Sequence, residues 1–167
     1  MMAALHYLAL GGFVVLMAAA AFEDFRRFTI PNWLTLGLCV LWPLSLFAGT
    51  TVSGAVGDLA CGLIVFAVGA LLFARGYIGG GDVKLLAAAA LWAGPALLPS
   101  LLIVTGLLGG VLALILLSPV GALLVSGTRA QLGFTAGPET AATSTPVAYG
   151  IAIAAASLIV ILPPQFS

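Results

Sequence analysis

Two aspartates in this sequence stand where a carboxylate is energetically costly and able to do chemistry. Asp24 closes the first apolar segment, and Asp82 opens a later one, directly after three consecutive glycines. An ionisable group at the edge of a hydrocarbon layer is tolerated mainly where it is used. Two carboxylates that meet in a dry site share one proton, because like charges at close range do not both ionise, and their pKa values separate. The ionised one can then take a proton from water while the other polarises a carbonyl, which is aspartic-protease chemistry and needs no metal or cofactor.

The composition indicates that these carboxylates belong to an integral membrane protein. Of the 167 residues, 63% are hydrophobic and 6% are charged, whereas a soluble domain carries roughly 25% charged residues. The length allows about six transmembrane helices of ~20 residues. We therefore expect an all-α polytopic membrane protein, a single membrane-embedded domain over residues 1–167 that is surrounded by membrane lipid. The formal net charge of zero gives no indication of a nucleic-acid partner.

The apolar segments place the two aspartates on the same side of the membrane. The pattern predicts segments at 3–22, 33–47, 58–74, 83–98, 100–117 and 146–162. With this arrangement one side receives every basic residue, namely Arg26, Arg27, Arg75, Lys84 and Arg129. Because basic residues accumulate in cytoplasmic loops, we expect both termini outside and both aspartates near the cytoplasmic face of the membrane.

The other acidic residues are weaker candidates. Asp58 begins the third segment at the outer face, where we expect it to cap a helix, and a straight span places it about 25 Å from the cytoplasmic end. Glu139 lies in the longest polar stretch and is expected to be solvated. Glu23 adjoins Asp24, but neighbours on a helix point about 100° apart, so only one of them can face the centre of the bundle.

Three other interpretations remain open at this stage. Asp24 and Asp82 could each pair with a nearby Arg or Lys as structural charges at the membrane edge. They could form the proton relay of a small transporter or channel subunit, although the outer half then offers only Asp58 and small hydroxyls to continue the path. The glycine loop and Lys84 could also hold a phosphate in a lipid enzyme, which would require further acidic residues to bind Mg²⁺.

Two motifs in the sequence resemble those of a known family. Residues 79–82, Gly-Gly-Gly-Asp, read as G-x-G-D, the signature of intramembrane aspartic proteases, and residues 77–85 resemble the bacterial type IV prepilin peptidases. In that family the first catalytic aspartate lies seven residues before the proline of an I/L-P-N/D motif. Asp24 lies seven residues before Pro31, so the resemblance selects Asp24 over Glu23. Residues 146–154 are similar to the Pro-Tyr-Gly-rich last span of the family, with Ala148 where many members have proline.

The resemblance implies an aspartic endopeptidase without cofactor or metal. Its substrates would be prepilin or pseudopilin precursors, whose short positively charged leader is cut at the cytoplasmic membrane face, commonly after a glycine. Larger members carry paired C-x-x-C motifs and an N-methyltransferase activity. This chain has two cysteines, Cys39 and Cys61, inside apolar segments and without that spacing, so we expect both to be small buried residues. The chain resembles the short, peptidase-only form that is associated with tight-adherence (Flp-type) pili.

We also expect roles for the residues around the two aspartates. Asp24 and Asp82 would be the catalytic pair, and glycines would give the backbone freedom that lets Asp82 approach Asp24. A proline in the first turn of the second helix and the asparagine after it would be structural. A lysine would either contact backbone carbonyls or phospholipid, or be a charge that extends to the inner face of the membrane. These supporting residues are Gly79, Gly81, Pro31, Asn32 and Lys84.

Overall fold

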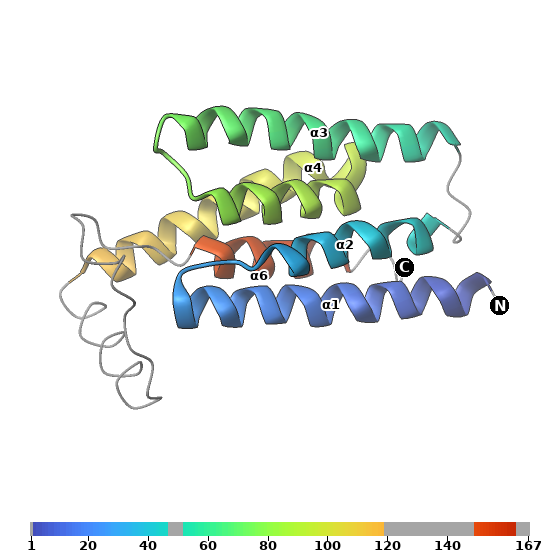
Figure 1. Cartoon of the computed structure of the whole chain (residues 1–167), viewed down its shortest axis with the longest axis horizontal. Helices are drawn as coiled ribbons and strands as arrows, with labels where there is room; N and C mark the ends of the chain where they lie inside the picture. The colour runs from blue at the N-terminus through green and yellow to red at the C-terminus, as the bar shows by residue number, and fades with distance from the viewer. Residues whose placement is uncertain (1, 47–51, 119–148, 163–167) are drawn as a thin grey trace.

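The protein is an assembly of five helices in the residues that the structure describes, 2–46, 52–118 and 149–162 of a computed structural model (Figure 1). The helices are α1 (Met2–Arg27), α2 (Asn32–Ser45), α3 (Val52–Ala74), α4 (Gly80–Leu117) and α6 (Tyr149–Ile161). α1, α3 and α4 contain stretches long and apolar enough to cross a membrane, whereas α2 and α6 are shorter apolar helices. The all-helical membrane architecture is confirmed, while six spans and the side of the termini stay predictions. Arg129, Glu139 and Ala148 lie outside the described residues.

α4 is bent back on itself at Gly94. Its 38 residues would extend about 57 Å as a straight helix, almost twice the ~30 Å hydrocarbon core. Gly94 instead adopts φ 61° and ψ −176°, a conformation that is essentially restricted to glycine. The earlier and later parts of α4 therefore run in opposite directions (Figure 1). The predicted break between the fourth and fifth segments, expected around Gly94–Pro95 and Pro99, is confirmed at Gly94, and Pro99 lies inside the helix.

Asp58 lies beside this bend and not at a helix start. α3 begins at Val52, so the expected cap at Asp58 is wrong, because the helix continues through Gly54 and Gly57. A Cβ on Gly94 would collide with Asp58 Oδ1. The Asp58 carboxylate accepts a hydrogen bond from the Trp42 side chain on α2. Asp58 thus connects α2 and α3 beside the bend of α4. We call the parts of α4 before and after Gly94 its first and second arms, and the helix dipole at the start of the second arm favours a negative charge.

The connection between α3 and α4 is short and fixed by backbone hydrogen bonds. Gly76 has φ 76°, and its N–H donates to the carbonyl of Phe73 at 2.9 Å, while the N–H of Tyr77 donates to that of Leu72 at 3.0 Å. This pair of bonds is a Schellman motif, in which glycine supplies the left-handed residue after a helix. The chain therefore reverses within a few residues and starts α4 beside the end of α3.

Close helix contacts depend on residues without large side chains. A Cβ on Gly69 of α3 would lie 2.7 Å from Val83 Cγ1 of α4, and one on Gly12 of α1 would lie 2.7 Å from Leu41 Cδ1 of α2. In a membrane the hydrophobic effect does not drive helices together, so close van der Waals packing through small residues takes its place. Glycine at these positions sets the spacing of the helices that carry the two aspartates.

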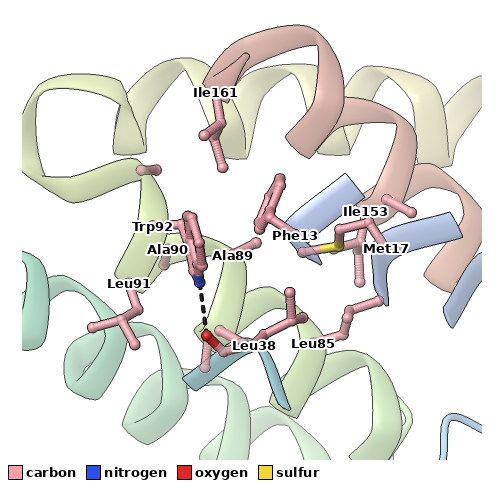
Figure 2. Packing of buried hydrophobic residues seen from close by; sticks show 14 of the residues in the cluster. Phe13, Met17, Leu38, Leu85, Ala89, Ala90, Leu91, Trp92, Ile153 and Ile161 are labelled. Atoms are coloured by element: carbon pink, nitrogen blue, oxygen red, sulfur yellow. Dashed lines mark hydrogen bonds between the residues drawn. The ribbon is translucent and has the colours of Figure 1, made fainter. Parts of the chain in front are cut away.

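The buried apolar residues fill the space among α1, α2, α4 and α6 (Figure 2). Phe13 and the ring of Trp92 pack with centroids 4.7 Å apart. Trp92 Nε1 donates to the carbonyl of Leu38 at 2.9 Å, so its polar atom is satisfied where Trp92 is only 9% exposed. This bond fixes α4 against α2. The expectation that both cysteines are buried is wrong for Cys39, which is exposed, and confirmed for Cys61.

The bend of α4 predicts different effects for two glycine substitutions. Gly94→Ala should destabilise the protein by about 1–3 kcal/mol, because alanine is strained at this φ and ψ and its Cβ meets Asp58. Gly106→Ala is the matched control, since a Cβ there meets nothing within 4 Å. Thermal unfolding of both purified variants in detergent measures the effect. Equal melting temperatures for Gly94→Ala and Gly106→Ala would contradict it.

Candidate active site

Asp24 is buried in the last turns of α1. The helix continues past the apolar segment to Arg27, which places Asp24 inside the bundle, where it is 4% exposed. A Cβ on Gly150 of α6 would lie 2.8 Å from Asp24 Oδ2. The carboxylate of Asp24 therefore lies directly against the backbone of α6, at a position where any side chain would displace it.

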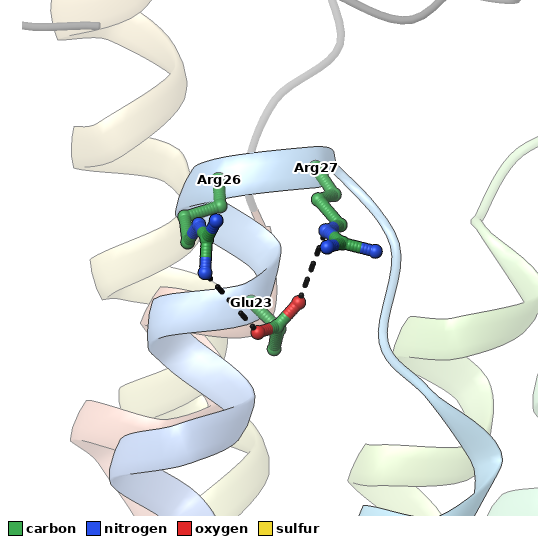
Figure 3. Close-up of polar contacts among 3 residues, drawn as sticks. All are labelled: Glu23, Arg26 and Arg27. Atoms are coloured by element: carbon green, nitrogen blue, oxygen red, sulfur yellow. Dashed lines mark ion pairs between the residues drawn. The ribbon is translucent and has the colours of Figure 1, made fainter. Parts of the chain in front are cut away.

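The Glu23 carboxylate lies between the side chains of Arg26 and Arg27 (Figure 3). It pairs with Arg26 at 3.9 Å and with Arg27 at 3.5 Å, one turn further along α1. Glu23 and Arg26 are half-buried and Arg27 is exposed, and such pairs near the surface contribute roughly 0–1 kcal/mol each. The prediction that only one of the two adjacent carboxylates faces the centre of the bundle is confirmed, and the buried one is Asp24.

The end of α1 directs the chain back toward the site. The N–H of Phe28 donates to the carbonyl of Asp24 at 2.9 Å, and Phe28 has φ 52°, which costs a non-glycine residue roughly 1–2 kcal/mol. This sharp turn brings Ile30 back into the bundle, where it is 8% exposed. Pro31, with φ −62° and ψ 139°, is the residue before α2 and not part of its first turn as predicted.

Asp82 lies in the first turn of α4, and a glycine shapes its surroundings. Gly79 is the extended residue before the helix, with φ −70° and ψ 142°, and its backbone N–H donates to the Asp82 carboxylate. This is the contact that an acidic residue at the third helical position makes in a capping box. A Cβ on Gly79 would lie 2.9 Å from Asp82 Oδ2. The predicted opening of the backbone is thus restricted to Gly79, since Gly80 and Gly81 are helical.

Ile30 connects the helices that carry the two aspartates. A Cβ on Gly81 would lie 3.2 Å from Ile30 Cβ, and one on Gly150 would lie 2.8 Å from Ile30 Cδ1. Ile30 therefore packs on the backbone of α4 on one side and on that of α6 on the other. Ile30 thereby links the start of α4, which carries Asp82, to the backbone of α6 against which the Asp24 carboxylate lies.

A hydrogen bond joins the remaining motif residues. Lys84 Nζ on α4 donates to Asn32 Oδ1 at the start of α2, over 3.0 Å. The bond is exposed, so its contribution to stability is small. It does fix the first turn of α4 against the start of α2, on the side of α4 away from Asp82.

A cavity adjoins Asp82. Tyr149 also lines this cavity, and it was not predicted from the sequence as a site residue. The cavity of about 280 Å³ lies between α3, both arms of α4 and α6, and in the described part of the chain only Asp82 and Tyr149 give it polar side chains. The Tyr149 hydroxyl donates to the carbonyl of Thr105 at 3.4 Å, and its ring lies against Gly109. The space next to Asp82 is therefore suited to an apolar group.

Comparison with known families identifies the family of the chain. The sequence model of the type IV leader peptidase family matches residues 12–114. The chain belongs to the type IV leader peptidase family. The match contains Asp24 and Asp82 together with the motifs around them, and the resemblance seen in the sequence is confirmed. No curated protein and no solved structure gives a significant match. α6 lies outside the matched residues of this leader peptidase. Its Tyr149 and Gly150 are therefore included in the candidate site because of their contacts in the structure and not because of the family match.

The contact between α6 and Asp24 predicts that Gly150→Ala impairs the leader peptidase. Its new Cβ forces the Asp24 carboxylate or Ile30 to move, and a displacement of about 1 Å at a reacting group can cost roughly a hundredfold in rate. The measurement is cleavage of a precursor by the purified variant, with thermal unfolding as a check on the fold. Gly110→Ala should cleave normally, because a Cβ there meets nothing within 4 Å. Full activity of Gly150→Ala would contradict the contact.

Proposed function

We propose that this leader peptidase is a membrane aspartic endopeptidase that cleaves the leaders of type IV, Flp-like prepilins. The observation that supports the proposal is the packing of Ile30, which contacts the backbone of α4 beside Asp82 and the backbone of α6 against which the Asp24 carboxylate lies. Asp24 is buried there, and a buried carboxylate is costly unless it is used. The family gives the substrate class, a prepilin-type precursor.

In the proposed reaction the two carboxyl groups divide acid and base roles. One is ionised and takes a proton from a water molecule, whose oxygen attacks the scissile carbonyl carbon. The other is protonated and donates to the carbonyl oxygen as the new C–O bond forms. The C–N bond then breaks as the amine takes a proton from the group that acted as base, and one hydroxyl of the intermediate returns its proton to the other carboxyl group as the C=O bond re-forms. Either aspartate can hold the shared proton at rest, because the pair titrates as a unit.

The arrangement of the charged helix ends supports cleavage at the cytoplasmic face of a bacterial inner membrane. α1 and α3 finish, and α4 begins, at the same end of the bundle (Figure 1). These ends carry Arg26, Arg27, Arg75 and Lys84, and basic residues gather on the cytoplasmic side. The extended residue Gly79 and the cavity beside Asp82 lie at this end, where a precursor emerging from the membrane would present its leader.

Removal of either aspartate's negative charge tests the pair. Asp24→Asn and Asp82→Asn should each lower the rate of leader removal by at least about a hundredfold, because an amide neither accepts the water proton nor shares one. Mass spectrometry of a co-expressed or purified precursor gives the readout. Glu23→Gln is the matched control and should cleave normally, since Glu23 faces Arg26 and Arg27. Normal processing by either aspartate variant would reject the proposal.

Chelation separates the aspartic mechanism from metal-dependent hydrolysis. With excess EDTA and then with a zinc-specific chelator, leader removal by the purified enzyme should keep its rate, because the two carboxyl groups activate water without a metal. A metal-dependent peptidase treated in parallel serves as the positive control. Loss of cleavage that returns when a divalent metal is added would show that the water is activated by a metal instead.

A further inference from the structure

A second cavity lies on the opposite side of α4 from Asp82. It has a volume of about 650 Å³ and runs between α2 and α3, with Ala87, Ala88 and Leu91 of α4 as its floor. Leu36 on α2 and Leu63 on α3 form its rims and are 62% and 67% exposed. We call this cavity the α2–α3 groove. Its volume is within the range of about 300–1,000 Å³ that is typical of small-molecule sites.

The charged, amide and hydroxyl side chains that line the groove are gathered at the end near Lys84. Lys84 and Asn32 line that end and are joined by their hydrogen bond. Thr35 lies beside them, and its hydroxyl donates to the carbonyl of Asn32 at 2.9 Å. In the described part of the chain Lys84 has no carboxylate partner, only the neutral amide of Asn32. The groove thus combines an apolar interior with an uncompensated positive charge at its mouth.

The length of the groove corresponds to one leaflet. On α2 its lining extends from Asn32 to Pro43, which is about 16 Å at 1.5 Å per residue. Half of a ~30 Å hydrocarbon core is about 15 Å. An apolar helix of a substrate would need a path across the whole core, whereas the acyl chain of one leaflet matches this length.

The groove also faces away from the candidate active site. Lys84 follows Asp82 by two positions, so the two side chains point roughly 200° apart around α4. Asp82 lines the cavity between α3, α4 and α6, and Lys84 lines the α2–α3 groove. A molecule in the groove therefore does not occupy the space next to the Asp82 carboxylate.

We propose that the α2–α3 groove is a binding site for an acidic glycerophospholipid, with one acyl chain in the groove and the headgroup phosphate on Lys84. The apolar interior, its one-leaflet length and the cation at its mouth each match one part of such a lipid. A bound acyl chain would fill the space between α2 and α3 and support the start of α2 against α4. The site is independent of the proposed peptidase activity, because binding is measured without any substrate.

Photolabelling tests the site directly. The full-length protein is reconstituted in phosphatidylcholine nanodiscs that contain a small fraction of phosphatidylglycerol with a diazirine in its acyl chain, and the labelled residues are mapped by mass spectrometry. Label should concentrate on groove residues such as Leu36, Cys39 and Leu63, and unlabelled phosphatidylglycerol should compete with it. Equal labelling of Val15 and Ile103, which are also exposed, or equal groove labelling by a phosphatidylcholine probe, would overturn the proposal.

Three variants distinguish the contribution of the headgroup contact to lipid binding from that of the acyl chain in the groove. Lys84→Gln should reduce groove labelling about fivefold, the effect of one basic residue near an anionic headgroup. Arg75→Gln, an exposed cation outside the groove lining, is the control and should keep full labelling. Cys39→Trp leaves the charge in place and fills the groove, so it should abolish labelling there. Unchanged labelling in Lys84→Gln, or in Cys39→Trp if Lys84→Gln does not fold, would overturn the proposal.

Discussion

The burial of the Asp24 carboxylate against the backbone of α6 is the constraint on which the rest of the site depends. A carboxylate removed from water loses a large solvation free energy, so the surrounding helices must come close enough to give it defined neighbours. They do so through Gly150, which leaves room for the carboxylate, and Ile30, which packs between α4 and α6. The turn at Phe28 is the local feature that returns Ile30 to this position.

Close contacts between side chains and glycine backbone also hold both arms of α4 in place. Its first arm packs on α3 through Gly69, and its second arm receives the ring of Tyr149 at Gly109. The reversal at Gly94 lets one helix supply both arms. Asp82 and Tyr149, which are far apart in the chain, therefore line one cavity at the end of the bundle where Asp24 is buried. The catalytic proposal needs this reversal as much as it needs the two carboxylates.

The two sides of α4 carry different chemistry, and this division connects the two proposals. Asp82 lies toward α3 and α6 and lines the cavity between them, while Lys84 lies toward α2 with the groove proposed for lipid. Lipid in the groove would contact the start of α2, which begins two residues after Ile30. The lipid proposal therefore predicts that the membrane supports part of the candidate active site.

The sequence alone determined the membrane class, the helical fold and the choice of Asp24 over Glu23, because composition, helix angles and motif spacing are local properties. It did not predict the roles of Gly150 and Tyr149, although the pair stands out in an apolar segment. It also placed Asp58 at a helix start, whereas α3 begins at Val52. The physical reason is common to these cases: the effect of a missing Cβ, or of a carboxylate within a helix, depends on which neighbour it meets. Only the packing of the helices decides that.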